Sequence, residues 1–370
     1  MERLYPQLIL DALKNVRYPA SGTDIVSAGM VEDDIRIDGN KVSFSLVFDR
    51  PTDPFIKSLV KAAETAIHTY ISPEVEIKGN IGVKTRHAAP AAPAVKPLAQ
   101  VKNIIGVSSG KGGVGKSTVA SNLAVALARE GYRVGLLDAD IFGPSQPKMF
   151  GVEDEELFMH KVDGRDLIIP HEKYGVKMLS IGFLVDKNAP VLWRGSMASN
   201  ALRQLITDAD WGELDYFVID MPPGTSDIHL TLVQTLPITG VVVVSTPQEV
   251  ALADARKGIA MFTGDKVNVP VLGLVENMAW FTPASHPDER YYLFGREGGV
   301  RLAKELGIRL LAQIPLVADV CDDADAGTPI ALKDTVMAHE FIHLAHEVTD
   351  AVEERNRALP PTEKVNVTKK

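Results

Sequence analysis

Nine consecutive residues have the types and spacing of a phosphate-binding loop. They are Gly110, Lys111, Gly112, Gly113, Val114, Gly115, Lys116, Ser117 and Thr118, which match the pattern G-x-x-x-x-G-K-[ST]. The glycines let backbone N–H groups approach an anion without a Cβ atom in the way. Lys116 would neutralise the β- and γ-phosphates, and Ser117 would bind Mg²⁺ through its hydroxyl. We therefore predict that this loop binds ATP with Mg²⁺.

Three aspartates follow apolar runs and supply the carboxylates that phosphoryl transfer uses. Asp138 and Asp140 follow the run 133–137, and Asp220 follows the run 216–219. A carboxylate at the end of a strand can hold Mg²⁺ directly or through its water shell. We predict a metal site formed by Ser117, Asp138 and Asp220, partly through water. Asp140 is predicted to orient the attacking water, and to be catalytic together with Lys116.

Two further groups are candidates for contacts with the nucleotide. Gly224 follows Asp220 in a Pro-rich turn and is expected to offer its N–H to the γ-phosphate. Asn277 lies at the end of a late apolar run, and its amide has the donor and the acceptor that suit a purine edge. We therefore add Asn277 to the predicted nucleotide-binding residues.

The loop lies between an apolar run at 104–107 and a helical stretch at 119–128, as the phosphate-binding motif requires. Strands are also predicted at 133–138, 216–220, 240–245 and 271–276, and a helix at 251–262. Alternating strands and helices indicate an α/β P-loop NTPase domain with a mostly parallel, doubly wound sheet. We assign residues 101–355 to this domain. The polar tail 356–370 is predicted to be mobile.

A smaller domain precedes the nucleotide domain. Residues 1–83 predict an α+β domain with helices at 8–13 and 54–70, a strand at 41–48 and the start of another strand at 75–77. Residues 84–100 are rich in Ala and Pro, which favours an extended linker. The sequence therefore predicts two domains joined by a linker.

The composition limits the partners. The 370 residues carry a net charge of −9, which argues against a general nucleic-acid-binding protein. No apolar run is long enough to span a bilayer, so we expect no membrane partner. The single cysteine, Cys321, cannot form an intramolecular disulfide and fits a reducing cytoplasm.

Several motifs together resemble those of one family. The early Lys111 and the pair Asp138 and Asp140 look like the deviant Walker-A ATPases related to MinD and ParA. Further matching segments are 143–145, 193–195, 220–227, 276–278, 294–299, 313–316 and 325–327. Over about residues 101–350 the chain resembles the Mrp/ApbC iron–sulfur cluster carrier ATPases. Residues 24–31 resemble part of the small domain that precedes the ATPase in bacterial members.

The resemblance implies a homodimer that hydrolyses ATP and delivers iron–sulfur clusters to apo-proteins. In the family, the residue that matches Lys111 reaches the partner subunit's phosphates, so Lys111 would be catalytic in trans. The matching role of Asn277 is contact with adenine.

The chain departs from the family pattern at the cluster ligands. Members usually carry C-x-x-C shortly after the segment that matches 276–278, but residues 281–290 contain no cysteine. The cysteine usual in the small domain is also missing. An all-thiolate [4Fe–4S] cluster needs four thiolates, and a dimer of this chain has two. His286, Asp288 and Glu289 offer nitrogen and oxygen ligands, although a polar, Pro-rich stretch is more typical of a solvated loop.

Two alternative functions follow from this departure. One is a nucleotide-switched dimeric scaffold that binds client proteins without carrying a cluster, which the missing cysteines favour. The other is a ParA- or MinD-like positioning ATPase. The acidic composition disfavours it, and so does the helical stretch 336–354, which carries His and Glu rather than a basic face.

Overall fold

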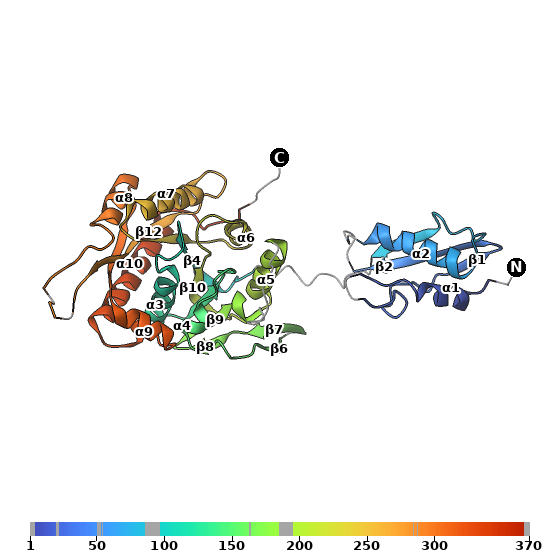
Figure 1. Cartoon of the computed structure of the whole chain (residues 1–370), viewed down its shortest axis with the longest axis horizontal. Helices are drawn as coiled ribbons and strands as arrows, with labels where there is room; N and C mark the ends of the chain where they lie inside the picture. Colours follow the sequence, from blue (N-terminus) through green and yellow to red (C-terminus); the bar gives the residue numbers. More distant parts are fainter. Residues whose placement is uncertain are drawn as a thin grey trace. The chain divides into compact units, whose positions relative to one another are not determined.

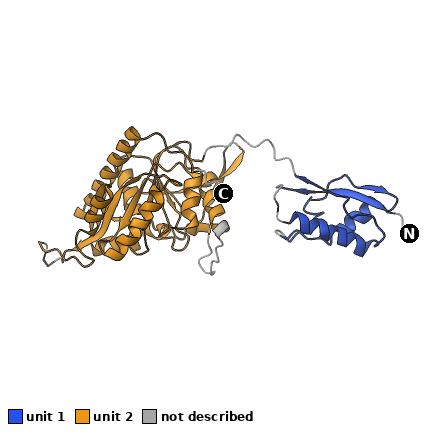
Figure 2. Ribbon diagram, turned by 90° about the horizontal axis from the view of Figure 1, so that it is seen from above, with its two compact units in different colours: residues 1–95 blue, residues 96–370 orange. Residues whose placement is uncertain are grey.

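The computed structural model describes most of the chain, divided into two compact units. The units are residues 1–95 and 96–370 (Figure 2). The described residues are 4–19, 22–49, 53, 55–85, 97–162, 164–184, 195–283, 285–286 and 288–365. Residues 86–96 of the predicted linker lie outside them, as do Trp193 and Arg194 of one resemblance motif.

The first unit is a small α+β fold. Its elements are α1 (Pro6–Leu13), β1 (Arg36–Asp38), β2 (Lys41–Phe48), α2 (Ile56–Tyr70) and β3 (Ile81–Thr85). Strand β2 pairs antiparallel with β1 and parallel with β3. The predicted strand at 75–77 is only an isolated bridge at Glu76, because the chain turns again before β3 begins. Lys84 and Thr85, assigned above to the linker, are the last residues of β3.

The second unit is built on an eight-stranded sheet (Figure 1). The order across it is β13-β12-β11-β4-β10-β5-β9-β8, and only β8 pairs antiparallel with its neighbour. The strands are β4 (Val101–Ser109), β5 (Val134–Asp138), β8 (His171–Lys173), β9 (Val176–Ser180), β10 (Leu214–Asp220), β11 (Gly240–Ser245), β12 (Val271–Phe281) and β13 (Leu310–Leu316). A separate hairpin consists of β6 (Phe158–Val162) and β7 (Arg165–Ile169).

Helices cover both faces of this sheet. They are α3 (Lys116–Arg129), α4 (Gln146–Met149), α5 (Gly195–Thr207), α6 (Asp227–Thr235), α7 (Glu249–Thr263), α8 (Gly298–Leu306), α9 (Ala318–Asp325) and α10 (Val336–Ala358), with 3-10 turns η1 (Ile181–Leu184) and η2 (Ile330–Leu332). In the part of the chain that the structure describes, no helix is long and apolar enough to cross a bilayer.

The apolar run of β11 shows why a continuous hydrophobic strand suits this fold. Val242 and Val244 pack into the core with α3 and α10. Val241 and Val243 pack into the core on the opposite face, with α5, α6, α7 and α8. Because successive side chains of a strand point to opposite faces, a strand covered on both sides must be apolar at every position. The prediction of a doubly wound α/β sheet is confirmed.

Side-chain bonds tie α3 to the segment around η2. Asn122 Oδ1 accepts a hydrogen bond from the Ala331 N–H at 2.9 Å, and Arg129 Nη1 donates to the Lys333 carbonyl at 2.8 Å. The segment beyond α10 is also bound, because the Val365 N–H donates to the Val233 carbonyl on α6. Helix α10 ends at Ala358, beyond the predicted helical stretch 336–354. The predicted tail therefore begins within the helix, and its described part has a bond to the unit at Val365. Residues 366–370 lie outside the described part.

Parallel strands bring the predicted site residues to one edge. The Cα atom of Asp220 pairs in register with that of Asp138 on β5 and that of Val107 on β4. The loops after β4, β5, β10, β11 and β12 therefore all leave from the carboxyl edge of the sheet, where open α/β sheets bind ligands.

A buried histidine at the start of α6 makes the stability of this edge depend on pH. His229 Nδ1 accepts a hydrogen bond from the Ser226 N–H at 3.2 Å, and burial lowers the pKa of His229 to about 4. Between about pH 6.5 and 4 the unfolded chain therefore binds a proton that the folded chain does not, so stability falls as pH falls.

We predict that wild type loses stability relative to His229→Gln as pH falls from about 6.5 to about 4. Glutamine keeps an acceptor for the Ser226 N–H but does not titrate. The difference between the two proteins in the free energy of unfolding should change by at most about 3 kcal/mol over this pH range. Chemical denaturation at each pH measures it. A constant difference between the two proteins from pH 7 to 4 would contradict the assignment.

Candidate functional site

The predicted phosphate-binding loop connects the end of β4 to the start of α3. Two of its glycines have left-handed backbone, with φ of +80° at Gly113 and +82° at Gly115. A Cβ atom on Gly110 would lie 2.2 Å from the carbonyl carbon of Asp254 on α7. The loop thus needs glycine for conformation at two positions and for close packing at a third.

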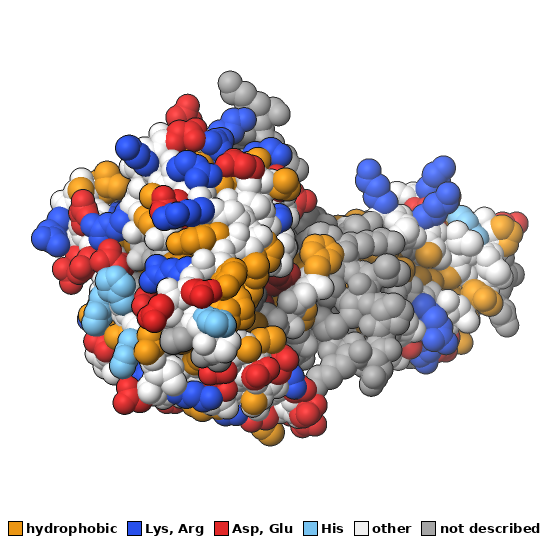
Figure 3. All heavy atoms as spheres, turned by 60° about the vertical axis from the view of Figure 1, so that its left-hand side comes forward, with side chains coloured by type: hydrophobic (Ala, Val, Ile, Leu, Met, Phe, Trp, Pro, Cys, Tyr) orange, Lys and Arg blue, Asp and Glu red, His pale blue; other side chains and the backbone are white. Residues whose placement is uncertain are grey.

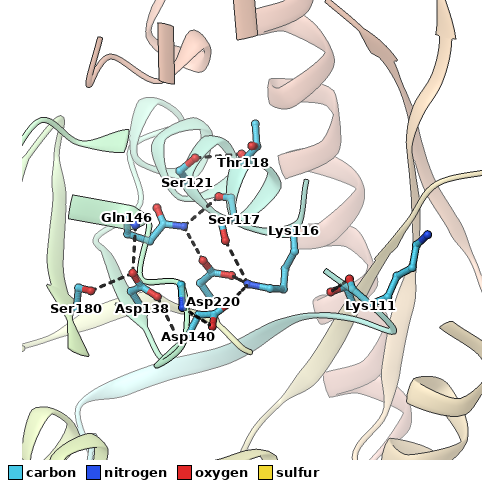
Figure 4. A network of polar contacts seen from close by, with 12 residues as sticks. Lys111, Lys116, Ser117, Thr118, Ser121, Asp138, Asp140, Gln146, Ser180 and Asp220 are labelled. Atoms are coloured by element: carbon cyan, nitrogen blue, oxygen red, sulfur yellow. Dashed lines mark hydrogen bonds and ion pairs between the residues drawn. The ribbon is translucent and has the colours of Figure 1, made fainter. Parts of the chain in front are cut away.

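Lys116 is the centre of a buried polar network (Figure 4). Its Nζ lies 2.5 Å from Asp220 Oδ1, 3.5 Å from Asp140 Oδ2 and 3.2 Å from Ser117 Oγ. The Lys116 side chain is 6% exposed, so these groups interact in a medium of low polarity. The fold therefore brings together the lysine, the hydroxyl and two of the three aspartates that the sequence singled out.

Asp138 completes this group of acidic side chains. Its Oδ1 accepts a hydrogen bond from the Asp140 N–H at 3.1 Å, and its Oδ2 accepts one from Ser180 Oγ at 2.9 Å. Complete burial, with the neighbouring charge of Asp220, raises the pKa of Asp138 to about 7. Burial also raises the pKa of Asp140, although Lys116 opposes that shift. Closely spaced, buried carboxylates of this kind gain stability from a cation.

The oxygen groups present suit Mg²⁺ shared with a nucleotide. Within the described ranges, no group of three or more His, Cys, Asp or Glu side chains is arranged to hold a metal ion. Mg²⁺ in nucleotide sites is commonly held by one or two carboxylates together with substrate phosphates, rather than by a cage of protein ligands. Ser117, Asp138 and Asp220 would supply the protein's share of such a site.

Lys111 and Asn277 lie beside this network rather than in it. The Lys111 side chain points away from Lys116 and Asp220 (Figure 4). Asn277 comes from the carboxyl half of β12, and its Nδ2 donates to the Val114 carbonyl at 2.8 Å. Asn277 therefore supports the phosphate-binding loop directly.

Two observations differ from the sequence analysis. The Gly224 N–H, expected to face the γ-phosphate, donates instead to the Ser109 carbonyl at 2.8 Å, because the turn after β10 packs back on the end of β4. Gln146 and Ser180 were not predicted, yet both contact Asp138. In the sequence, only their positions could have pointed to the site. Gln146 comes shortly after the two aspartates, and Ser180 follows the apolar residues Met178 and Leu179.

The segment that lacks the expected cysteines leaves the end of β12. Phe281 pairs with Tyr291 across it, and His286 Nδ1 lies 3.7 Å from Glu289 Oε1. Cys321 is exposed on α9, with its Sγ 4.0 Å from Asp325 Oδ2. Among the described residues, neither the segment after β12 nor the surroundings of Cys321 contain a group of side chains arranged to hold a metal ion.

Each of the two units matches a known protein family. Residues 100–349 match the family described as NUBPL iron-transfer P-loop NTPase, and residues 6–78 match the family described as iron–sulfur cluster assembly protein. The iron–sulfur cluster carrier protein of Synechocystis sp. is 44% identical over 325 residues, which cover 88% of this chain and 90% of that protein. The Pseudomonas fragi protein of the same name is 54% identical over 237 residues, covering 64% and 81%.

A solved structure agrees with the sequence matches. The nucleotide-binding protein from Archaeoglobus fulgidus, solved in complex with ADP, is 38% identical and superposes with a TM-score of 0.55. The match covers 64% of this chain and 91% of that one.

The geometry of Gly115 yields a stability prediction. A Cβ atom at Gly115 would require left-handed backbone and would lie 2.2 Å from Asn277 Nδ2. Gly115→Ala should therefore lower the free energy of unfolding by about 2–4 kcal/mol, measured by chemical denaturation. Gly112→Ala is the matched control, because no atom lies within 4 Å of a Cβ there. Its stability should stay within about 1 kcal/mol of wild type. Equal effects of the two substitutions would refute this account.

Proposed function

The chain belongs to the family of NUBPL iron-transfer P-loop NTPases, and from this membership we propose a specific activity. It binds ATP with Mg²⁺, hydrolyses the ATP as a homodimer and serves in the delivery of iron–sulfur clusters to apo-proteins. The single cysteine fits work in the reducing cytoplasm.

The observation that carries the nucleotide part of the proposal is the buried contact between Lys116 and Asp220. In this state the ammonium is neutralised by Asp220 and Asp140. The β- and γ-phosphates would compete with these carboxylates for the Lys116 ammonium, because together they carry more negative charge than a carboxylate. Asp220 Oδ1 would then be free to hold Mg²⁺ together with the Ser117 hydroxyl.

Hydrolysis needs few further groups. When bound, Mg²⁺ would neutralise charge that develops on the phosphate oxygens. Asp140 would orient a water molecule for attack on the γ-phosphorus. The new P–O bond would form as the bond to the β–γ bridging oxygen breaks, leaving ADP and inorganic phosphate. Positioning and charge neutralisation of this kind account for most of the catalysis in phosphoryl transfer.

The orientation of Lys111 supports a dimer with shared sites. Within the described part of the chain, the Lys111 ammonium makes no hydrogen bond or ion pair, and it points away from Lys116 (Figure 4). A second subunit facing the carboxyl edge would receive this charge at its own phosphates. Lys111 would then act in trans, as an arginine finger does.

Among the described residues, the face of the larger unit shown in Figure 3 has no basic area of the kind that binds nucleic acid. Lys and Arg on it are interspersed with Asp and Glu. The proposed partners are therefore a second copy of the chain and client proteins, including apo iron–sulfur proteins.

The proposed cargo depends on residues other than those of the nucleotide site. The relatives above are named as carriers, whereas this chain has one cysteine and none in segment 281–290. This observation favours one second candidate. It is a dimeric scaffold that changes its affinity for client proteins with the bound nucleotide and holds no cluster itself. The nucleotide chemistry is the same in both.

The two lysines provide a matched pair of variants. Lys111→Ala should keep nucleotide affinity within about threefold while lowering ATP hydrolysis by at least about 10³-fold. Lys116→Ala should lose both nucleotide binding and hydrolysis. Nucleotide binding by fluorescence and phosphate release measure the two effects.

Mixing the two variants tests the in-trans role of Lys111. In a mixed dimer the Lys116→Ala subunit supplies Lys111 to the intact Lys116 site of its partner, so hydrolysis should partly return. Normal turnover by Lys111→Ala alone, or no recovery on mixing, would refute the in-trans role. Retained hydrolysis in Lys116→Ala would refute the site.

Anaerobic reconstitution with iron and sulfide distinguishes carrier from scaffold. The carrier proposal expects a labile cluster on the full chain and its transfer to an apo-protein, followed by absorbance and by activation of the recipient. A cysteine-bearing relative is the positive control. If the relative transfers a cluster and this chain binds none, the carrier proposal fails. ATP-dependent binding of a client protein would then support the scaffold.

A further inference from the structure

Gln146, which the nucleotide motifs do not include, connects the proposed metal ligands with one another. It is the first residue of the short helix α4 and is fully buried. Its Nε2 donates to Asp220 Oδ2 at 2.9 Å and to the Ser117 carbonyl at 3.0 Å, and its backbone N–H donates to Asp138 Oδ2 at 3.1 Å. Gln146 thus bonds the carboxylates of Asp138 and Asp220 directly, and it bonds Ser117 through the backbone carbonyl rather than through the hydroxyl predicted to bind Mg²⁺ (Figure 4).

The chemistry at this position requires an amide donor. Both partners of Nε2 are acceptors, a carboxylate and a carbonyl, so turning the amide over would place its oxygen against two other oxygens. The Gln146 Oε1 atom is buried and has no hydrogen-bond partner among the described residues. An unpaired buried acceptor is costly, and the bonds made by Nε2 offset that cost.

The two oxygens of Asp220 are held by different residues. Lys116 contacts Oδ1, and Gln146 contacts Oδ2. If Lys116 turns to the phosphates, Oδ1 loses its partner while Oδ2 keeps the bond from Gln146. The carboxylate therefore stays in place and presents its free oxygen to the ion.

Gln146 also limits repulsion inside the site. Asp138 and Asp220 lie side by side on neighbouring strands, and like charges at this separation in a buried place destabilise one another. Gln146 gives one donor to each carboxylate, through its backbone and its side chain. Without the side-chain donor, Lys116 would be the one side chain among the described residues that bonds the Asp220 carboxylate.

We propose that Gln146 is a positioning residue for the Mg²⁺ site, which keeps Ser117, Asp138 and Asp220 arranged for the ion while Lys116 changes partner. This inference rests on the proposed Mg²⁺–nucleotide site. It assigns no contact between Gln146 and the nucleotide, so its loss should weaken the response to Mg²⁺ more than the binding of nucleotide itself.

The test compares ADP affinity with and without Mg²⁺ on the full chain. A fluorescent ADP analogue is titrated in EDTA and then over a range of Mg²⁺ concentrations, and bound Mn²⁺ is measured separately by electron paramagnetic resonance. Gln146→Met removes the donor at similar volume and should raise the half-saturating Mg²⁺ concentration at least tenfold. Its ADP affinity in EDTA should stay within about threefold of wild type. Gln146→Asn, the milder variant, cannot reach both partners and should raise that concentration at least threefold.

Asn122→Met is the matched control. Asn122 is also a buried amide that donates to a carbonyl in the first turn of α3, that of Thr118, but it contacts no carboxylate. Thermal unfolding should show lower stability for this variant, with the half-saturating Mg²⁺ concentration unchanged.

The outcomes separate this inference from the proposed function. If wild type responds to Mg²⁺ and both Gln146 variants respond at the same concentration, the positioning role is wrong and the site stands. An equal fall of ADP affinity in EDTA would also overturn the role, because it would show general support of the loop. If wild type itself shows no Mg²⁺ response, the proposed function and this inference fail together.

Discussion

A single buried ammonium, that of Lys116, lies among carboxylates that parallel strands bring to the same edge. Asp220 and Asp138 are in register on adjacent strands, and Asp140 follows two residues later. One positive charge cannot neutralise three negative charges in a buried place. Burial and this imbalance raise the pKa of Asp138. Hydrogen bonds from the Ser180 hydroxyl and from the Gln146 and Asp140 N–H groups oppose that shift.

The same imbalance suits the site for a magnesium nucleotide. A phosphate group would take over the lysine, and a divalent cation would supply the positive charge that the carboxylates lack. The proposed exchange of partners would start from the contacts of Lys116 with Asp220 and Asp140. Helix α3 is anchored to the Ala331 and Lys333 backbone and Asn277 bonds the phosphate-binding loop, so the proposed exchange would need no movement of α3 or of the loop.

The nucleotide motifs and the segment where the resemblance places cluster ligands differ in how far they match the family pattern. The loop, Lys116 and the aspartates are present and lie together, whereas the segment after β12 has polar and aromatic residues where the resembling family has cysteines. The two proposed functions would depend on different segments at the same edge of the sheet, so one could change without the other. Asn277 and segment 281–290 are nevertheless parts of one stretch of chain, since β12 runs on to Phe281.

The sequence by itself determined the phosphate-binding loop, the α/β class and the aspartates at strand ends. These features depend on local patterns: glycine spacing, alternation of strands with helices, and carboxylates directly after apolar runs. It did not reveal Gln146, whose partners Ser117 and Asp220 are 29 and 74 residues away, nor that Gly224 turns back to Ser109. It also placed the end of the last helix too early. Only the tertiary structure decided these points, because a hydrogen bond between distant segments depends on how strands align across the sheet, and no local pattern encodes that alignment.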